Sequence, residues 1–218
     1  MENYSEKFWR LRLESCRKAL VKNHFEVFVA QTPEDARRIF LEEILPGLHV
    51  HSASWGDSLT LHATGILEEI RRNPEIELLE TFDPAVPRET LIERRRQALL
   101  VDLFMTGSNA LTESGQLVNL DMIGNRIGAI TFGPRHVIVF AGRNKIVGTV
   151  EEAMRRIKQF AAPLNSIRHE DFNLPCASTG RCMDCQSPKR ICNTWCITEK
   201  SYPKKRIKVI LINGEHGL

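Results

Sequence analysis

Apolar and polar positions alternate with two different periods along the first hundred residues. Residues 4–23 place apolar side chains at helical spacing among many charges, which predicts a helix. The next stretch, HFEVFVA, is rich in β-branched and aromatic residues and predicts a strand at 24–30. The alternation continues with helices predicted at 32–45, 58–72 and 88–104 and strands predicted at 49–55 and 76–82.

The pattern changes to shorter segments after Gly107. Three apolar runs separated by Gly- and Asn-containing turns predict short strands, and one amphipathic segment predicts a last helix. These strands are expected at 116–121, 126–132 and 136–141, and the helix at 149–161. The stretch RIKVILI, residues 206–212, is continuously apolar near its end and predicts an interior strand covered on both faces. Alternation of strands and helices indicates an α/β fold class with a largely parallel sheet.

The chain is predicted to form one domain. Residues 1–213 are expected to make up this α/β unit, with a cysteine-rich loop at 171–203 before the last strand and a short tail at 214–218. The composition, 42% hydrophobic and 26% charged, is that of a globular protein and excludes a disordered chain or a coiled coil. The N-terminus has no apolar signal segment and no run is long enough to cross a membrane, so we expect a cytoplasmic protein.

Charge is distributed unevenly. The net charge of +3 is too small to demand a nucleic-acid partner. The segment 168–208, however, holds nine Lys and Arg against four Asp and Glu, while acidic residues outnumber basic ones in the remainder. Five of the six cysteines lie in the same segment, and only Cys16 lies outside it. A short, basic, cysteine-rich segment is therefore distinct from an ordinary globular body.

The cysteine-rich segment is the strongest chemical signal. A CxxC pair allows two thiolates to reach one metal from a tight turn, and nearby cysteines can complete a set of four. Clustered cysteines in a chain without a secretion signal indicate metal or redox chemistry, although reduced free thiols or disulfides remain alternatives. The spacing does not distinguish zinc from an iron–sulfur cluster, and it leaves one of five cysteines spare. The cysteines are Cys176, Cys182, Cys185, Cys192 and Cys196.

A second candidate site lies in residues 106–145, where Gly, Asn and short polar residues separate apolar strands. Loops at strand ends bind ligands in α/β folds, so these polar side chains are expected to share one cleft. The alternative is that Asn and Gly only form turns. The scattered histidines His62, His136 and His169 are interpreted as structural. The candidate residues of the cleft are Glu113, Asn119, Asp121, Asn125, Arg126, Asn144 and Lys145.

Three strings within this stretch are distinctive. They read NALTESGQLVNLD at 109–121, GNRIGAITFGP at 124–134 and GRNKIV at 142–147. Together they resemble the LUD-domain family, the lactate-utilisation proteins. The segment 175–192, which contains PCASTGRCMDC and SPKRIC, resembles the cysteine-bearing branch of that family.

The resemblance implies a Rossmann-like layered fold similar to that of sugar-phosphate isomerases and CoA transferases. It also implies a subunit of an iron–sulfur complex that oxidises lactate or a related 2-hydroxy acid, with other subunits as partners. No flavin-binding signature or long ferredoxin-like cysteine run is present, so partners would supply those groups. Within this resemblance the ligands of the cluster, or of zinc, are Cys176, Cys182, Cys185 and Cys192, and Cys196 is the spare.

Two other functions stay open at this point. A free-standing acyl- or CoA-transferase-like or isomerase-like enzyme would use Glu113 as a nucleophile, with Asp121 as a second catalytic carboxylate. This alternative rests on analogy between folds. A zinc-bearing nucleic-acid-binding module is favoured by the basic segment, but the single CxxC pair and the few aromatic residues near it count against this function.

Overall fold

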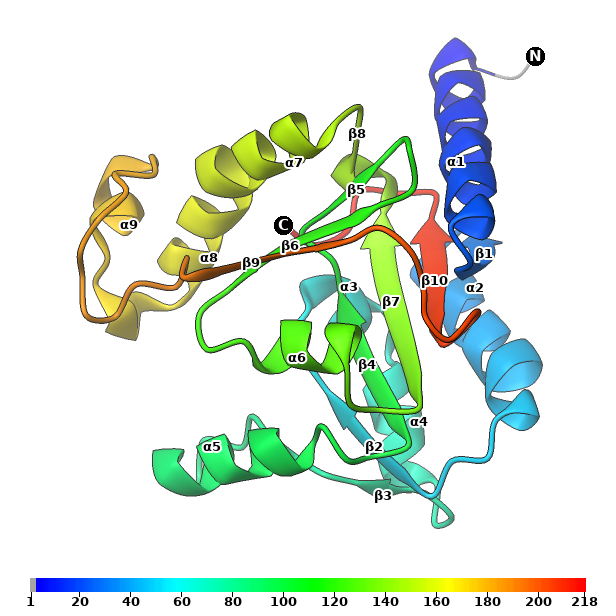
Figure 1. Ribbon diagram of the computed structural model, residues 1–218, viewed down its shortest axis with the longest axis horizontal. Helices are drawn as coiled ribbons and strands as arrows, with labels where there is room; N and C mark the ends of the chain where they lie inside the picture. The colour runs from blue at the N-terminus through cyan, green and yellow to red at the C-terminus, as the bar shows by residue number, and fades with distance from the viewer. Residues whose placement is uncertain (1–2) are drawn as a thin grey trace.

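A computed structural model describes residues 3–218, apart from the side chain of Glu170, and shows two sheets with helices around them (Figure 1). The strands are β1 (Glu26–Ala30), β2 (Ser52–Trp55), β3 (Glu77–Leu78), β4 (Leu103–Gly107), β5 (Ala110–Thr112), β6 (Leu117–Asp121), β7 (His136–Gly142), β8 (Ile146–Val147), β9 (Thr194–Thr198) and β10 (Ile207–Ile212). The α-helices are α1 (Tyr4–Lys22), α2 (Pro33–Arg38), α3 (Leu59–Thr64), α4 (Ile66–Arg72), α5 (Arg88–Gln97), α6 (Asn125–Thr131), α7 (Val150–Arg156), α8 (Ala162–Arg168) and α9 (Pro175–Thr179).

The main sheet has six parallel strands in the order β1-β10-β7-β4-β2-β3. This confirms the predicted α/β class with a mostly parallel sheet. The predicted interior strand is β10, which pairs with β1 on one side and β7 on the other and is buried along its whole length. A strand covered on both faces favours apolar side chains at successive positions, which explains the apolar run at 209–212. The buried Lys208 interrupts this pattern and pairs with Glu26 of β1 at 3.4 Å.

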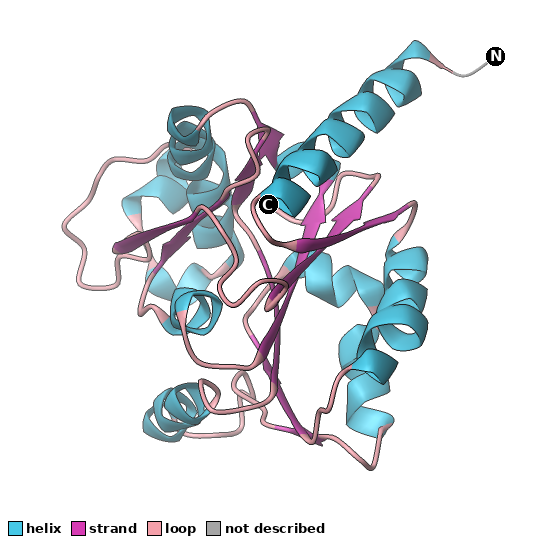
Figure 2. Ribbon diagram, turned by 45° about the vertical axis from the view of Figure 1, so that its right-hand side comes forward, coloured by secondary structure: helices cyan, strands magenta, loops and turns pink. Residues whose placement is uncertain are grey.

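Helices cover both faces of the main sheet (Figure 2). Successive side chains of a strand point to opposite faces, so each interior strand contributes to two cores. On one face, Ile138 and Phe140 of β7 pack with apolar residues of α2, α3 and α4. On the other face, Val137 and Val139 pack with residues of α1, β5, β6 and α6. The sheet therefore acts as a rigid layer between two cores.

The second sheet is small, with the order β8-β5-β6-β9. Its strand β9 lies within the segment 171–203 that the sequence indicated as a loop, and pairs antiparallel with β6, placing Cys196 opposite Asn119. The cysteine segment is thus held to the body by a strand before the chain returns to β10. In Figure 1 the segment with α8 and α9 lies on the opposite side of the molecule from α1 and α2.

Two predicted elements are wrong in type. Residues 126–132, expected as a strand, form helix α6, because Gly124 with φ +85° turns the chain and the Asp121 carboxylate accepts a hydrogen bond from the Ile127 N–H at 3.1 Å. The helix expected at 88–104 ends at Gln97, and the apolar residues that follow form β4 between β2 and β7. A short apolar run suits either element, and only pairing with neighbouring strands decides between them.

Other predicted elements differ in extent. The helix expected at 32–45 starts as α2 and continues with π-helical turns at Ile39–Ile44. The helix expected at 58–72 is divided at Gly65, whose φ of +70° breaks the helical path. The third strand contracts to Glu77–Leu78 at the sheet edge. Within residues 3–218, no helix combines the length and the apolar character that crossing a bilayer requires.

Candidate functional site

A cavity of about 620 Å³ lies at the carboxyl ends of three neighbouring strands of the main sheet, β2, β4 and β7. Ligands bind in this position in open α/β sheets. The strand ends contribute three lining residues: Asp57 after β2, Gly107 at the end of β4 and Lys145 after β7. Residues of α5, α6, α8 and the cysteine segment complete the lining. The basic residues that line it are Arg88, Arg95, Arg126, Lys145, Arg168 and Lys189, against the acidic residues Asp57, Asp121 and Asp171.

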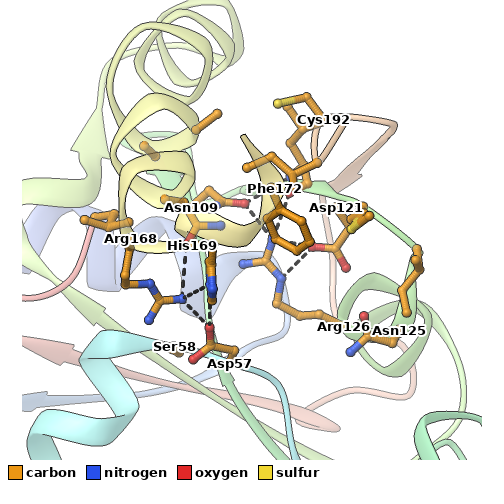
Figure 3. A pocket seen from close by; sticks show the side chains of 18 of the residues that line it. Asp57, Ser58, Asn109, Asp121, Asn125, Arg126, Arg168, His169, Phe172 and Cys192 are labelled. Atoms are coloured by element: carbon orange, nitrogen blue, oxygen red, sulfur yellow. Dashed lines mark hydrogen bonds and ion pairs between the residues drawn. The ribbon is translucent and has the colours of Figure 1, made fainter. Parts of the chain in front are cut away.

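One group of side chains joins β6 to α6 at the cavity wall (Figure 3). The Arg126 guanidinium donates to the Asp121 carboxylate at 2.8 Å and to the Asn109 side-chain oxygen at 2.7 Å. The side chains of Asp121 and Arg126 are only 8% and 12% exposed. Both Asp121 oxygens are engaged, since the second accepts from the backbone of α6. The pair therefore fixes α6 against the cavity and leaves no free carboxylate there.

Lys145 lies on the same wall and is 4% exposed. Among the described residues no carboxylate pairs with it. Burial lowers the pKa of Lys145 from its usual 10.5 to about 7, and the positive charges of Arg156 and Arg126 also lower it. A buried lysine without a counter-ion is rare in proteins and costs folding free energy, so it marks this end of the cavity.

A second polar group lies at the end of β2, where Figure 3 shows Asp57, Arg168 and His169 together. Asp57 forms an ion pair with Arg168 and a 3.3 Å contact with His62. Burial alone would raise the pKa of Asp57, but the hydrogen bonds from His62 and Arg168 outweigh it and hold this pKa at about 2. Burial and Arg168 lower the pKa of His169, so its ring is neutral at pH 7. The His169 Nε2 atom accepts from the Arg168 guanidinium at 3.0 Å, so the ring helps to hold this polar group together.

The sequence interpretation missed this group. It interpreted His62 and His169 as structural. The sequence gives no local indication that they meet Asp57, because Asp57 and its partner Arg168 are 111 positions apart. A signal was present, since Asp57 and Ser58 directly follow a predicted strand, where polar residues reach the carboxyl edge of a sheet.

The predicted cleft residues separate into three sets. Asp121, Asn125, Arg126 and Lys145 line the cavity. The Asn119 side chain is fully buried behind it and accepts hydrogen bonds from the Asn109 N–H and the Ser108 hydroxyl, whose residues do line it. Two further residues, Asn144 and Glu113, are outside the lining.

Asn144 holds the C-terminal tail. Its side-chain amide donates to the Gly217 carbonyl at 3.3 Å, and its oxygen accepts from the His216 N–H.

Glu113 lies at the turn after β5, facing α1, and not in the cavity. Its carboxylate is 2.6 Å from the Arg12 guanidinium and its side chain is 45% exposed. The expectation that it shares a cleft with Asp121 is therefore corrected. The reason is the β5–β6 hairpin, which carries Glu113 to the end of the small sheet away from Asp121.

The four cysteines assigned by the family resemblance line one small cavity of about 20 Å³, together with Lys158 and Arg190. Arg190 closes the segment on itself, because its guanidinium donates to the carbonyls of Cys185 at 2.7 Å and Cys192 at 3.0 Å. Cys196 lies elsewhere, on β9, with its sulfur 3.4 Å from the Thr131 hydroxyl. The four lining cysteines are Cys176, Cys182, Cys185 and Cys192.

The thiols of this small cavity interact electrostatically. Burial raises the pKa of Cys192; Lys158 opposes this, and the neighbouring Cys182 and Cys176 raise it further. All six cysteines are free thiols. Within the described part of the chain, no three His, Cys, Asp or Glu side chains are grouped for binding one metal ion. Ala162, Ile191 and Cys192 line both cavities, so the cysteine cavity adjoins the larger one.

Nearly the whole chain is similar to known proteins, both in fold and in sequence pattern. The crystal structure of a DUF162 family protein from Deinococcus radiodurans is similar in fold, with a TM-score of 0.50 and 14% sequence identity. The similarity covers 94% of this chain and 98% of that one. No curated protein matches the sequence. The sequence pattern of the LUD domain matches residues 13–212. The chain therefore belongs to the LUD domain family, which is associated with lactate utilisation.

Proposed function

We propose that this protein is a cytoplasmic subunit of a complex that oxidises lactate or a related 2-hydroxy acid, and that its cysteine segment carries an iron–sulfur cluster. The observation that carries the proposal is the gathering of four cysteines around one cavity next to the larger one. Four thiolates are the usual protein ligands of such clusters. A bound cluster would supply one-electron transfer between the larger cavity and partner subunits.

The side chains around the cysteine cavity have the chemistry that an iron–sulfur cluster requires. Lys158 and Arg190 line the cysteine cavity, so positive charge lies beside thiols that ionise on binding. Four sulfurs bound to one zinc at 2.3 Å lie only about 3.8 Å apart. The cysteines surround their cavity without forming such a single-ion group among the described residues. The choice of an iron–sulfur cluster over zinc therefore rests on the resemblance of the cysteine segment to the cysteine-bearing branch of the family, and not on the spacing of the sulfurs.

The alternatives from the sequence have weaker support. An acyl- or CoA-transferase using Glu113 as nucleophile needs that carboxylate in the ligand cavity, and it pairs with Arg12 outside it. A nucleic-acid-binding module is supported only by the excess of basic residues in 168–208, and one of these, Arg190, already binds Asp184 at 2.8 Å.

The test is anaerobic purification followed by reconstitution with iron and sulfide. We expect iron and acid-labile sulfide to bind together, with the visible absorption of a cluster. Cys182→Ser and Cys192→Ser should each lower the bound iron several-fold. Cys196→Ser is the matched control, since Cys196 lies in the same segment but outside the cysteine cavity, and it should keep the wild-type iron content.

If the protein bound zinc and no iron, the metal would be structural, and this result would contradict the proposed redox role. Unchanged iron in both Cys182→Ser and Cys192→Ser would show that the cysteine cavity is not the site. Failure to bind any metal under reducing, anaerobic conditions would reject the proposal altogether.

A further inference from the structure

We propose that the Lys145 end of the larger cavity binds the oxyanion group, carboxylate or phosphate, of a small anionic ligand. Lys145 lines the cavity, is 4% exposed and has no carboxylate partner among the described residues. A cation that is enclosed by protein, and reachable only from a cavity, gains a partner when an anion enters that cavity. The proposal does not depend on a metal in the cysteine segment.

The charge balance around Lys145 supports an anion. Arg126 and Arg156 are the two charged neighbours that act on its amine. Arg126 already has its carboxylate partner, Asp121. Among the described residues Arg156 has no carboxylate partner: its guanidinium donates to the carbonyls of Asn144 at 3.2 Å and Asn109 at 3.0 Å and lies over the Phe160 ring. The group therefore holds three cations against one carboxylate, and an entering anion would offset the excess of buried positive charge.

The surroundings of Lys145 restrict the size of the charged group. A Cβ added at Gly217 would lie 3.1 Å from the Lys145 Nζ atom and 2.5 Å from the Thr60 hydroxyl, so the C-terminal tail packs closely on this side. Ser58 lines the same cavity after β2, and its hydroxyl accepts from the Leu61 N–H, which leaves its own O–H as a neutral donor for a ligand. The Ser108 hydroxyl, in contrast, already donates within the protein. A compact oxyanion fits Lys145 and Ser58 as donors better than a bulky group does.

Binding at this site should be coupled to a proton. Since the pKa of Lys145 is about 7, roughly half of the chains carry a neutral amine at pH 7. An anion stabilises the protonated form, so its binding takes up about half a proton per chain at pH 7. Asp121 does not oppose this, because both of its oxygens are engaged by Arg126 and the Ile127 N–H.

The experiment uses four probes at constant ionic strength: acetate, L-lactate, pyruvate and inorganic phosphate. Binding is followed by the rise in Tm and by calorimetry in two buffers of different ionisation enthalpy, which reports proton uptake. We expect at least one probe to bind the wild type, with Kd rising from pH 7 to pH 9. Comparison of the carboxylates with phosphate identifies the head group.

Lys145→Met should weaken that binding at least tenfold and abolish the proton uptake. Lys204→Met is the control, since Lys204 is exposed and lies outside the cavity, and it should bind like the wild type. The proposal is overturned if no probe binds the wild type. It is equally overturned if Lys145→Met binds as tightly as the wild type, which would place the anion beside another basic residue of the cavity.

Discussion

Replacement of Lys145 by methionine is expected to stabilise the ligand-free fold at neutral pH. The lysine is buried without a carboxylate partner, while the unfolded chain leaves it in water. Methionine keeps most of the side-chain volume and has no charge to bury, and such replacements of buried charge are often stabilising.

The magnitude follows from the pKa. A lysine whose pKa falls from 10.5 to about 7 on folding carries a penalty of roughly 5 kcal/mol at acidic pH, because one pKa unit corresponds to about 1.4 kcal/mol. Between pH 7 and pH 10.5 the unfolded chain binds more protons than the folded one, so the stability of the wild type rises with pH. The penalty is about 4 kcal/mol at pH 7 and about 2 kcal/mol at pH 9.

The assay is urea unfolding of wild type, Lys145→Met and Lys204→Met at pH 7, 8 and 9 under reducing conditions. The stability advantage of Lys145→Met over wild type should shrink by about 2 kcal/mol across this range. A change in packing caused by the methionine alters its stability advantage equally at pH 7, 8 and 9, so it does not change how that advantage depends on pH. Lys204 is exposed, so its variant supplies the baseline for loss of a lysine.

An advantage of Lys145→Met that is constant from pH 7 to pH 9 would refute the reasoning. It would mean that the amine keeps its charge in the fold, and therefore that a counter-ion or water neutralises the burial penalty.

Three further predictions concern other parts of the molecule. Asp57→Asn should lower the free energy of unfolding by about 1–3 kcal/mol at pH 7, because the hydrogen bonds from His62 and Arg168 lose their charged acceptor. The loss should fade as the pH falls from 3.8 towards 2, where the wild-type carboxylate is protonated as well. Urea unfolding of wild type and variant at pH 7 and pH 3 measures this difference. Glu113→Gln should change stability by no more than about 1 kcal/mol, since its pair with Arg12 is partly exposed, and should leave anion binding unchanged in calorimetry. Truncation after Pro175 removes β10 from between β1 and β7, so near-UV circular dichroism should show loss of fixed packing; a truncated chain with cooperative unfolding would contradict this.

Elements whose signals are local were predictable from the sequence. Helix α1 has its amphipathic spacing, and β10 has the apolar run 209–212, because an interior strand must bury both faces. The strings at 109–121 and 142–147 also pointed to cavity residues, since Asp121 and Lys145 follow strands whose ends meet at the cavity.

Other features were decided by contacts between distant segments. The residues of β4 form a strand because their backbone pairs with β2 on one side and β7 on the other. The segment 126–132 became a helix because the Asp121 carboxylate binds its first turn. In both cases the local pattern allowed either element, and tertiary pairing supplied the energy difference.

The sequence alone determined the fold class, the clustering of cysteines and the polar character of the loops, because these follow from periodicity and composition. Tertiary structure alone decided which side chains meet. It brought Asp57 to Arg168 across 111 positions, turned Glu113 towards Arg12, and placed the cysteine cavity beside the larger one. Burial and charge at Lys145 likewise depend on neighbours from separate elements, and no local pattern encodes them.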